Sequence, residues 1–268
     1  MAAPKLDLKR STYSHLKVNK LGIRAFVKED APKYKDGQAE RAKKACRLIY
    51  RNKVLSAPGR VIIMDDETYV PVDRNAINGK EFYNARIRGG VADQFRFKPR
   101  EKFTAKYLVW QAIDENGNVS EAYIQKGTMN GETYLNECLK KRLLPFIERH
   151  HPDRNILFWP DMARIHYTGA IVQWLEANGI DFVNYGENAP NVPQARPVEI
   201  FWDKCKGEYK RRKEDAKSLS SFKRIWRNIS VKVARSCAQS LMKRARRNLR
   251  LIGYKGVHAP FKRRDRVA

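Results

Sequence analysis

Long apolar runs and paired cysteines are the features that this 268-residue sequence lacks most plainly. No window approaches the roughly 18 uninterrupted apolar residues of a membrane-spanning helix, and the first ten residues contain no apolar signal core. We therefore expect neither membrane insertion nor secretion. The four cysteines, Cys46, Cys138, Cys205 and Cys237, lie far apart with no paired spacing. This pattern argues against a zinc knuckle or a disulfide framework and predicts reduced, intracellular thiols.

Acidic residues are scarce as well, because 29 Asp and Glu face 55 Lys and Arg and leave a formal net charge of +26. Lys and Arg outnumber Asp and Glu by 16 to 5 in residues 1–60 and by 22 to 5 in residues 201–268, whereas residues 61–200 hold 17 basic and 19 acidic side chains. A basic arm alone is typical of many nucleic-acid-binding surfaces, including ribosomal and histone-like ones. Two arms around an acidic centre favour a polyanionic substrate that is held at its sides while cations act on its phosphates.

Apolar patterns in the centre of the chain predict strands and helices in mixed order. Strands are expected over residues 59–70, 155–161 and 180–185, a hairpin over 106–125, and helices over 130–151, over 166–179 and from Pro197 onwards. With 42% hydrophobic residues the chain can fill a core. A hairpin followed by alternating strands and helices predicts an α/β fold, with a mixed sheet flanked by helices.

Carboxylates lie at the ends of two of these predicted strands. The apolar run of the strand predicted over residues 59–70 ends in Asp65, Asp66 and Glu67, and Asp161 follows Phe-Trp-Pro at the end of 155–161. Ligands of α/β sheets collect at strand ends, so the carboxylates of Asp66 and Asp161 meet if their strands are neighbours. Glu199, near the start of the helix after Pro197, can lean in as a third. A lone Asp at a strand end is usually a turn former, but three carboxylates with no lysine between them repel unless cations lie there.

Four stretches of the chain, in their order, carry a resemblance to a known family. They are GRVIIMDDETYV, LVWQAIDENGNVSEAYIQKGTMNGETYLNECL, ILFWPDMARIHYTGAIVQWLEANGIDFV and NAPNVPQARPVEIFWDKCK. Each is weak alone, but together they resemble the catalytic domain of Tc/mariner-family DNA transposases over roughly residues 30–258. The resemblance implies an RNase H-like fold.

The resemblance also implies a catalytic triad of the DDE type. Asp66 matches the Asp that directly precedes Glu, with Asp65 as the fallback, and Asp161 matches the Asp that is followed five positions later by a histidine, here His166. Glu199 matches the acidic residue of a Pro-Ile-Glu-x-x-Trp motif, which reads Pro-Val-Glu-x-x-Trp here. Asp65 and His166 are candidates for residues that orient the triad without binding the metal themselves. For His166, capping of its helix is the more ordinary role. The chain departs from the family in two ways, since a Met follows the second Asp where Asn is usual and the spacing to Glu199 is longer than the commoner one.

In the family this triad implies two Mg²⁺ or Mn²⁺ ions, about 3.5 to 4 Å apart, that promote phosphodiester cleavage at transposon ends and strand transfer into target DNA. The implied partners are double-stranded DNA, as inverted repeats and as target, and a second copy of the chain in a homodimeric synaptic complex, with no membrane. Two alternatives stay open: a domesticated descendant that binds DNA without cutting it, and an RNase H-like nuclease without strand transfer.

Basic clusters outside the triad are the candidates for DNA contact and nuclear import, although such clusters are usually solvated faces. The candidate DNA-binding residues are Lys210, Arg211, Arg212, Lys213, Lys243, Arg244, Arg247 and Arg250. The expected location is the nucleus.

The expected domains follow from the same patterns. Residues 1–26 resemble the remnant of a helix-turn-helix DNA-binding domain, and 27–58 are expected to form a basic linker helix. An RNase H-like core is expected over 59–215 and a basic helical extension over 216–268.

Overall fold

The computed structural model describes residues 12, 15–22, 31–79, 91–97, 102–212 and 215–261. The chain divides into two compact units, Met1–Ala31 and Pro32–Ala268. Within the described part of the first unit lies one short π-helix, η1 (Leu16–Lys20). The other positions of the suspected DNA-binding remnant lie largely outside the described residues, so this assignment stays a prediction, as do the four domain boundaries.

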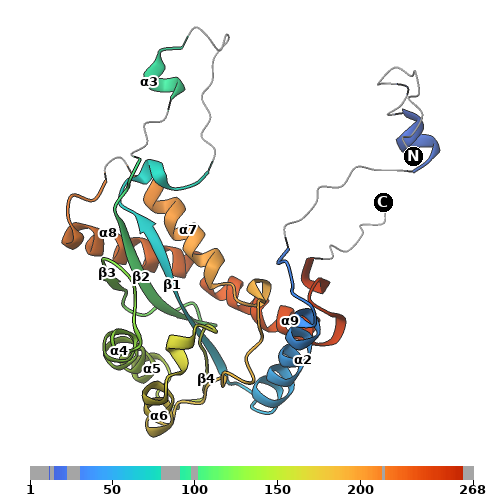
Figure 1. The fold of residues 1–268 in the computed structure, drawn as a ribbon, viewed down its shortest axis with the longest axis vertical. Helices are drawn as coiled ribbons and strands as arrows, with labels where there is room; N and C mark the ends of the chain where they lie inside the picture. Colours follow the sequence, from blue (N-terminus) through green and yellow to red (C-terminus); the bar gives the residue numbers. More distant parts are fainter. Residues whose placement is uncertain are drawn as a thin grey trace. The chain divides into compact units, whose positions relative to one another are not determined.

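A four-stranded sheet forms the centre of the described part of the second unit, with the strand order β3-β2-β1-β4 (Figure 1). Its strands are β1 (Val61–Pro71), β2 (Lys106–Asp114), β3 (Tyr123–Gln125) and β4 (Ile156–Trp159). The β1-β2 and β2-β3 pairs are antiparallel and the β1-β4 pair is parallel. The mixed sheet that the sequence predicts is therefore confirmed, and so is the hairpin of β2 and β3.

The strand expected over residues 180–185 is wrong as an element, because it is reduced to one parallel bridge between Phe158 and Phe182. Two backbone hydrogen bonds hold this bridge, from Phe158 N to Asp181 O and from Val183 N to Phe158 O. The chain then turns at Asn184, whose carbonyl accepts hydrogen bonds from the backbone N–H groups of Glu187 and Asn188. This turn ends the pairing before a strand can form.

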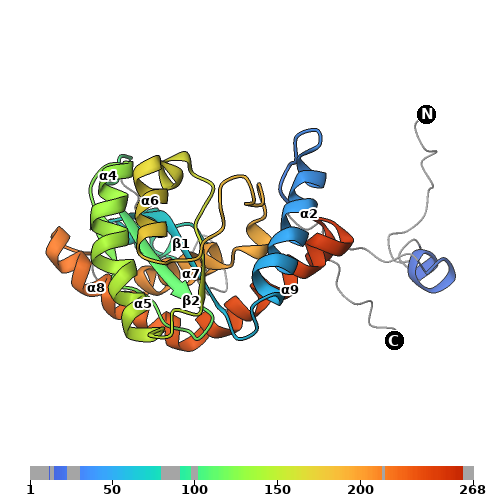
Figure 2. The ribbon, with the colours of Figure 1, turned by 90° about the horizontal axis from the view of Figure 1, so that it is seen from below.

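Helices cover both faces of the sheet, as Figure 2 shows from below. The first face carries α4 (Gly131–Thr133), the π-helix η5 (Tyr134–Leu143), α5 (Leu144–His150) and α6 (Gly169–Ala177). The Asn130 side chain accepts a hydrogen bond of 2.8 Å from Thr133 N and so caps the first turn of α4. The opposite face carries α7 (Val198–Lys210), α8 (Leu219–Val233), the π-helix η8 (Ala234–Ala238) and α9 (Gln239–Lys255).

Shorter elements connect these layers. They are η3 (Arg74–Ala76), α3 (Asp93–Arg96), η6 (Arg164–Tyr167), η7 (Pro193–Ala195) and η9 (Ala259–Phe261). Each face of the sheet has its own cluster of buried apolar side chains, with Ile63 and Phe158 on the first face and Met64 and Trp159 on the second. This split follows from the alternation of side chains along a strand.

Helix α2 (Gln38–Ile49) continues into the π-helix η2 (Tyr50–Leu55) and packs against α9. The backbones approach so closely at Gly253 that an added Cβ would lie 2.8 Å from both the Cα and the N of Arg47. Ala42, Cys46 and Ile49 of α2 are buried in the same cluster as α7, α8 and α9. Part of the expected basic linker is thus a packed element of the second unit.

No helix among the described residues is long and apolar enough to cross a membrane. All four cysteines are free, as the sequence predicts, and Cys46, Cys138 and Cys205 are buried.

Candidate active site

The parallel register of β1 and β4 places the first two predicted carboxylates opposite each other. Met64 pairs with Trp159 at the end of β4. Asp66, within β1, and Asp161, just beyond the end of β4, each lie two residues further along, so both lie on the same side of the sheet. The structure therefore confirms that the strands that lead to these two residues are neighbours, although β1 continues past Asp66 to Pro71.

Helix α7 brings the third carboxylate to this edge. Its buried stripe, which includes Val198, Phe201 and Trp202, packs on the second face of the sheet. Trp202 Nε1 donates a hydrogen bond of 3.1 Å to Asp66 Oδ2, and this contact fixes the first turn of α7, which carries Glu199, beside β1. Helix α7 packs against β1 in agreement with this contact.

A cavity of about 430 Å³ opens between these elements, and all three predicted carboxylates line it. We call it the carboxylate cavity. The cavity is lined by Asp66, Asp161 and Glu199, by Met162, and by Arg196 and other residues of the segment that precedes α7. The structure thus brings the three predicted residues to one place, while their roles as catalytic groups and metal ligands stay predictions.

Arg196 is the unexpected member of the carboxylate cavity, because the sequence predicts no cation among these carboxylates. The residue is 8% exposed, and its guanidinium donates hydrogen bonds to the carbonyls of Trp159 (2.9 Å), Pro160 (3.1 Å) and Asp65 (2.8 Å). One side chain thereby joins the end of β4 to β1, directly behind the two Asp residues. The guanidinium carbon also lies 5.7 Å from the centroid of the Trp159 ring.

The charges of the carboxylate cavity are only partly balanced. Burial raises the pKa of Asp66 to about 7; the Arg196 guanidinium opposes this rise, and the negative charge of Asp161 adds to it. Glu199 is exposed as a whole residue, yet desolvation of its carboxyl group at the cavity wall raises its pKa. The charge of Arg196 opposes this rise, and the charge of Asp161 adds to it. One cation therefore faces several carboxylates, and a bound divalent cation would relieve their repulsion.

Asp65 points to the other face of the sheet, because neighbouring residues of a strand alternate. It is fully buried, and its Oδ2 accepts hydrogen bonds from Trp110 Nε1 at 2.9 Å and from Tyr134 OH at 2.6 Å. Burial raises its pKa, although both hydrogen bonds and nearby His166 act in the opposite direction. The geometry therefore favours Asp66 over Asp65 as the residue that faces the carboxylate cavity.

A buried network on this other face connects β1 to the backbone of Asp161. His166 Nε2 lies 2.9 Å from Glu67 Oε1, and its Nδ1 lies 3.3 Å from the carbonyl oxygen of Asp161. The His166 ring also stacks on Tyr134, with centroids 4.2 Å apart. Burial alone lowers the pKa of His166, but the hydrogen bond to Glu67 and the charges of Asp65 and Glu67 raise it to about 9. At neutral pH the ring is therefore an imidazolium that can donate to both oxygens.

The donor set of the carboxylate cavity suits a hard divalent cation, because it consists of carboxylate oxygens. In the part of the chain that the structure describes, however, no three His, Cys, Asp or Glu side chains are gathered closely enough to form a ready metal centre. The chemistry of the ligands fits Mg²⁺ or Mn²⁺, and binding would require the carboxylates to close further around the ion.

The predicted DNA-binding residues lie on two surfaces. Lys243, Arg244, Arg247 and Arg250 are all exposed along α9. At the end of α7, Lys210 Nζ donates a hydrogen bond of 3.0 Å to the carbonyl of Gly79, Arg211 pairs with Glu208, and Arg212 is exposed. Lys213 lies outside the described residues. Contact of these side chains with DNA stays a prediction.

Sequence reasoning missed Arg196 and the contacts that Glu67 and Tyr134 make. Glu67 follows Asp66 directly and was visible as an acidic neighbour, but its partner His166 lies 99 positions away. Tyr134 looks like an ordinary apolar position of a helix, and only the fold shows that its hydroxyl group reaches Asp65. No local pattern carries that information.

Comparisons with known proteins agree with this architecture. No protein-family model matches the sequence, and no curated protein matches it. Among solved structures, the Mos1 transposase paired-end complex with left transposon end is similar at 17% identity, covering 92% of this chain and 71% of that chain, with a TM-score of 0.66. The Mos1 strand transfer complex is similar at 18% identity over 87% of this chain and 68% of that chain, with a TM-score of 0.61.

The isolated Mos1 catalytic domain, solved with Raltegravir and Mg, is also similar, at 17% identity over 87% of this chain and all 100% of that chain, with a TM-score of 0.56. At such identities the likeness is one of fold. The second unit has an RNase H-like α/β fold, with the mixed sheet and flanking helices that the sequence predicts.

Proposed function

We propose that this chain is the catalytic part of a DNA transposase of the Tc/mariner type, which cuts phosphodiester bonds at transposon ends and joins them to target DNA. The observation that carries this proposal is the position of Asp66, Asp161 and Glu199 on one cavity, where β4 ends beside β1. The fold shared with Mos1 transposase, which was solved with transposon ends and in a strand transfer complex, supports it.

The three carboxylates of the cavity are the proposed ligands of two Mg²⁺ or Mn²⁺ ions. Solved Mos1 structures with Mn and with Mg support the choice of a divalent cation. Such ions, when bound, activate a water or a 3′-hydroxyl and stabilise the leaving oxygen. The new bond forms between the attacking oxygen and phosphorus while the bond from phosphorus to the DNA 3′ oxygen breaks.

The other residues of the site would hold the ligands in place. Trp202 Nε1 orients the Asp66 carboxylate, and Arg196 fixes the backbone behind Asp66 and Asp161 through its three carbonyl contacts. The guanidinium also offsets part of the negative charge before cations bind. These contacts keep two ligands from different strands at a constant separation, which metal-assisted phosphoryl transfer requires.

His166 and Asp65 are proposed as positioning residues. The imidazolium of His166 joins Glu67, the neighbour of Asp66, to the carbonyl of Asp161, and so connects the two strands from the face opposite the cavity. Asp65 anchors the same part of β1 through Trp110 and Tyr134. Outer contacts of this kind orient ligands and strengthen metal binding.

The partners proposed with this function are double-stranded DNA, both inverted repeats and target, and a second copy of the chain in the complex that pairs two ends. The Mos1 complexes with transposon ends support DNA as partner. The formal net charge of +26 and the exposed basic residues of α9 support it independently. We place the protein in the nucleus, where such DNA lies.

A DNA-binding descendant without cleavage activity is the second candidate. It is favoured by one observation, namely that the carboxylates of the described residues are not gathered into a ready metal centre. A nuclease without strand transfer would share the same carboxylate cavity, and only the products of the reaction distinguish it from a transposase.

The test is metal-dependent cleavage of labelled DNA. Duplex oligonucleotides are incubated with and without Mn²⁺, and the parent is compared with Asp161→Asn and with Asp153→Asn, an exposed Asp close by in the chain that does not line the cavity. We expect nicking that needs Mn²⁺, is lost in Asp161→Asn and persists in Asp153→Asn.

Products then decide between the candidates. Joining of a 3′ end to a second duplex supports the transposase, and nicking without joining favours the nuclease. Binding without any cleavage in the parent would contradict the enzyme and leave the DNA-binding descendant.

A further inference from the structure

A second cavity adjoins the carboxylate cavity. It has a volume of about 540 Å³ and lies between α2 and residues 185–190, and we call it the α2 groove. Its lining includes Arg41, Lys44 and Leu48 from α2 and Tyr185 from the facing segment. Met162 and Asn188 line both this groove and the carboxylate cavity, so the two spaces adjoin at these residues. A DNA strand in the groove would therefore lie beside the carboxylate cavity, at the residue that follows Asp161.

The positive charge of the α2 groove lies on one side of α2. Arg41 and Lys44 are three residues apart, so their exposed side chains extend from the same side of the helix. The acidic residue of the lining is Glu187, and its carboxylate lies 3.9 Å from Lys53 Nζ, which balances it. The groove therefore presents two cations toward an anionic ligand, next to a cavity that is rich in carboxylates.

The α2 groove also has an apolar and aromatic part. Tyr185 is 46% exposed and Leu48 is 40% exposed, and Met162 lines the groove together with them. The Tyr185 ring packs edge to face on Tyr167, with centroids 5.2 Å apart. Tyr167 is itself fixed, since its hydroxyl donates to the Val183 carbonyl at 3.1 Å. An exposed aromatic face held in a constant orientation is a platform on which a nucleic-acid base can stack.

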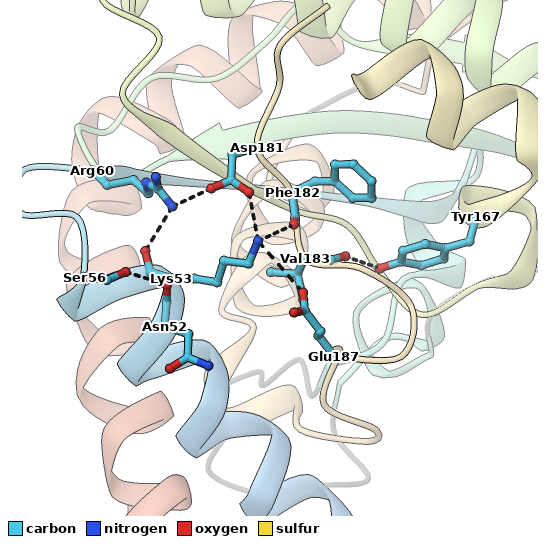
Figure 3. A network of polar contacts seen from close by, with 9 residues as sticks. All are labelled: Asn52, Lys53, Ser56, Arg60, Tyr167, Asp181, Phe182, Val183 and Glu187. Carbon is cyan, nitrogen blue, oxygen red and sulfur yellow. Dashed lines mark hydrogen bonds and ion pairs between the residues drawn. The ribbon is translucent and has the colours of Figure 1, made fainter. Parts of the chain in front are cut away.

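A polar network beside the groove is drawn in Figure 3, and it includes Glu187 of the groove lining. Lys53 of η2 extends toward Asp181 and Phe182, with Nζ 3.0 Å from Asp181 Oδ1 and 3.5 Å from the Phe182 carbonyl. Arg60 Nη1 approaches the other oxygen of Asp181 at 2.5 Å. These contacts tie the continuation of α2 to the chain that leads into residues 185–190. The groove is thus preformed, which reduces the ordering that a ligand must undergo.

We propose that the α2 groove binds a single-stranded stretch of DNA next to the bond that is cut, with backbone phosphates on Arg41 and Lys44 and a base stacked on Tyr185. The inference rests on the proposed function, because it takes the carboxylate cavity as the place of cleavage. The volume suits a ligand the size of one or two nucleotides. Proteins that bind single-stranded nucleic acid combine cations for the phosphates with exposed aromatic rings for the bases.

Binding of a labelled oligonucleotide of about ten deoxynucleotides tests the groove, measured by fluorescence anisotropy with the full chain in EDTA, where no metal-dependent cleavage can occur. The charge variant is Arg41→Gln with Lys44→Gln. Its matched control is Arg47→Gln with Arg51→Gln, which removes the same charge from exposed positions of the same helix and its continuation, outside the groove lining. Thermal melting of every variant verifies that the fold is kept.

The charge variant should lower the slope of log K against log salt by about 1.4, since each phosphate contact on a single strand contributes about 0.7. The control should leave the slope nearly unchanged. Equal losses in the two variants would overturn the groove, because they would mean that only total charge matters.

Tyr185→Ala should weaken binding of the single strand by roughly 5- to 150-fold, the range of one stacked base. Tyr185→Phe should restore most of this loss, since Phe keeps the ring. Unchanged affinity in Tyr185→Ala, or tighter binding of the matching ribonucleotide strand than of DNA, would overturn the proposal.

The two proposals fail in different ways. If the parent cuts DNA but the groove variants bind like their control, the groove inference is wrong and the proposed function stands. If the groove variants lose binding as expected while the parent never cuts, the groove is supported and the catalytic assignment is wrong.

Discussion

Replacing Arg196 by Ala is the sharpest perturbation of the architecture that holds the site together. The guanidinium is buried and donates hydrogen bonds to three carbonyls, one on β1 and two at the end of β4. Hydrogen bonds from a charged group contribute about 1.5 to 3 kcal/mol each, and buried acceptors that lose their donor cost about 1 to 3 kcal/mol each. Water that fills the truncated space recovers part of this loss, so we expect a net destabilisation of about 3 to 5 kcal/mol, as for a buried charge pair that loses one partner.

Urea unfolding measures this loss as a shift in the midpoint at constant slope. Arg250→Ala is the matched control, since Arg250 is exposed on α9 and should change the free energy of unfolding by no more than about 0.5 kcal/mol. Arg196→Lys should be intermediate, because an ammonium keeps the charge but lacks the planar fork that reaches several carbonyls.

In a thermal scan the Arg196→Ala loss corresponds to a melting temperature lower by about 6 to 20 °C. A loss below about 1 kcal/mol, or one equal to that of Arg250→Ala, would refute the idea that Arg196 joins the two strands.

Three further predictions concern packing, pH and positioning. Gly253→Ala places a methyl group 2.8 Å from the Arg47 backbone and should destabilise the fold by about 1 to 3 kcal/mol. Gly207→Ala in α7 has open space around the added Cβ and should stabilise the fold by up to about 1 kcal/mol, measured in the same urea series. Asp66→Asn in EDTA should raise the melting temperature, and the increase should grow from pH 4 to pH 7 and then level off. The reason is that a folded pKa of about 7, against an ordinary 3.8, makes the ionised carboxylate destabilising as pH rises. An increase in melting temperature that is independent of pH would contradict this prediction. His166→Ala should weaken Mn²⁺ binding in calorimetry by about 10- to 100-fold through loss of orientation, and an unchanged Kd would exclude a positioning role.

The parts of the site that the sequence predicts are those set by strand patterns. Apolar runs that lead to Asp66 and Asp161 mark two buried strands, and parallel pairing then brings the two residues together, although β1 continues past Asp66 to Pro71. The helix after Pro197 places its apolar stripe on the sheet, so Glu199 had to lie near the same edge. The alternation along β1 separates Asp65 from Asp66, but both faces of this strand are buried, so the pattern alone does not tell which face carries the cavity.

The parts that the sequence could not predict depend on contacts between distant segments. Arg196 meets the carbonyl of Asp65 across 131 positions, in a stretch whose prolines and glycine indicate only a turn. The expected strand over 180–185 fails for the opposite reason, since its local pattern is apolar but the turn at Asn184 ends the pairing.

The central claim is that the side chains of Asp66, Asp161 and Glu199 bind divalent cations together. A crystal of the protein grown with Mn²⁺, with anomalous scattering recorded at the manganese edge, tests it most directly. We predict two anomalous peaks about 3.5 to 4 Å apart, bounded by these three carboxylates. Saturating Mn²⁺ that leaves this cavity without a peak, or that binds only elsewhere, would contradict the account.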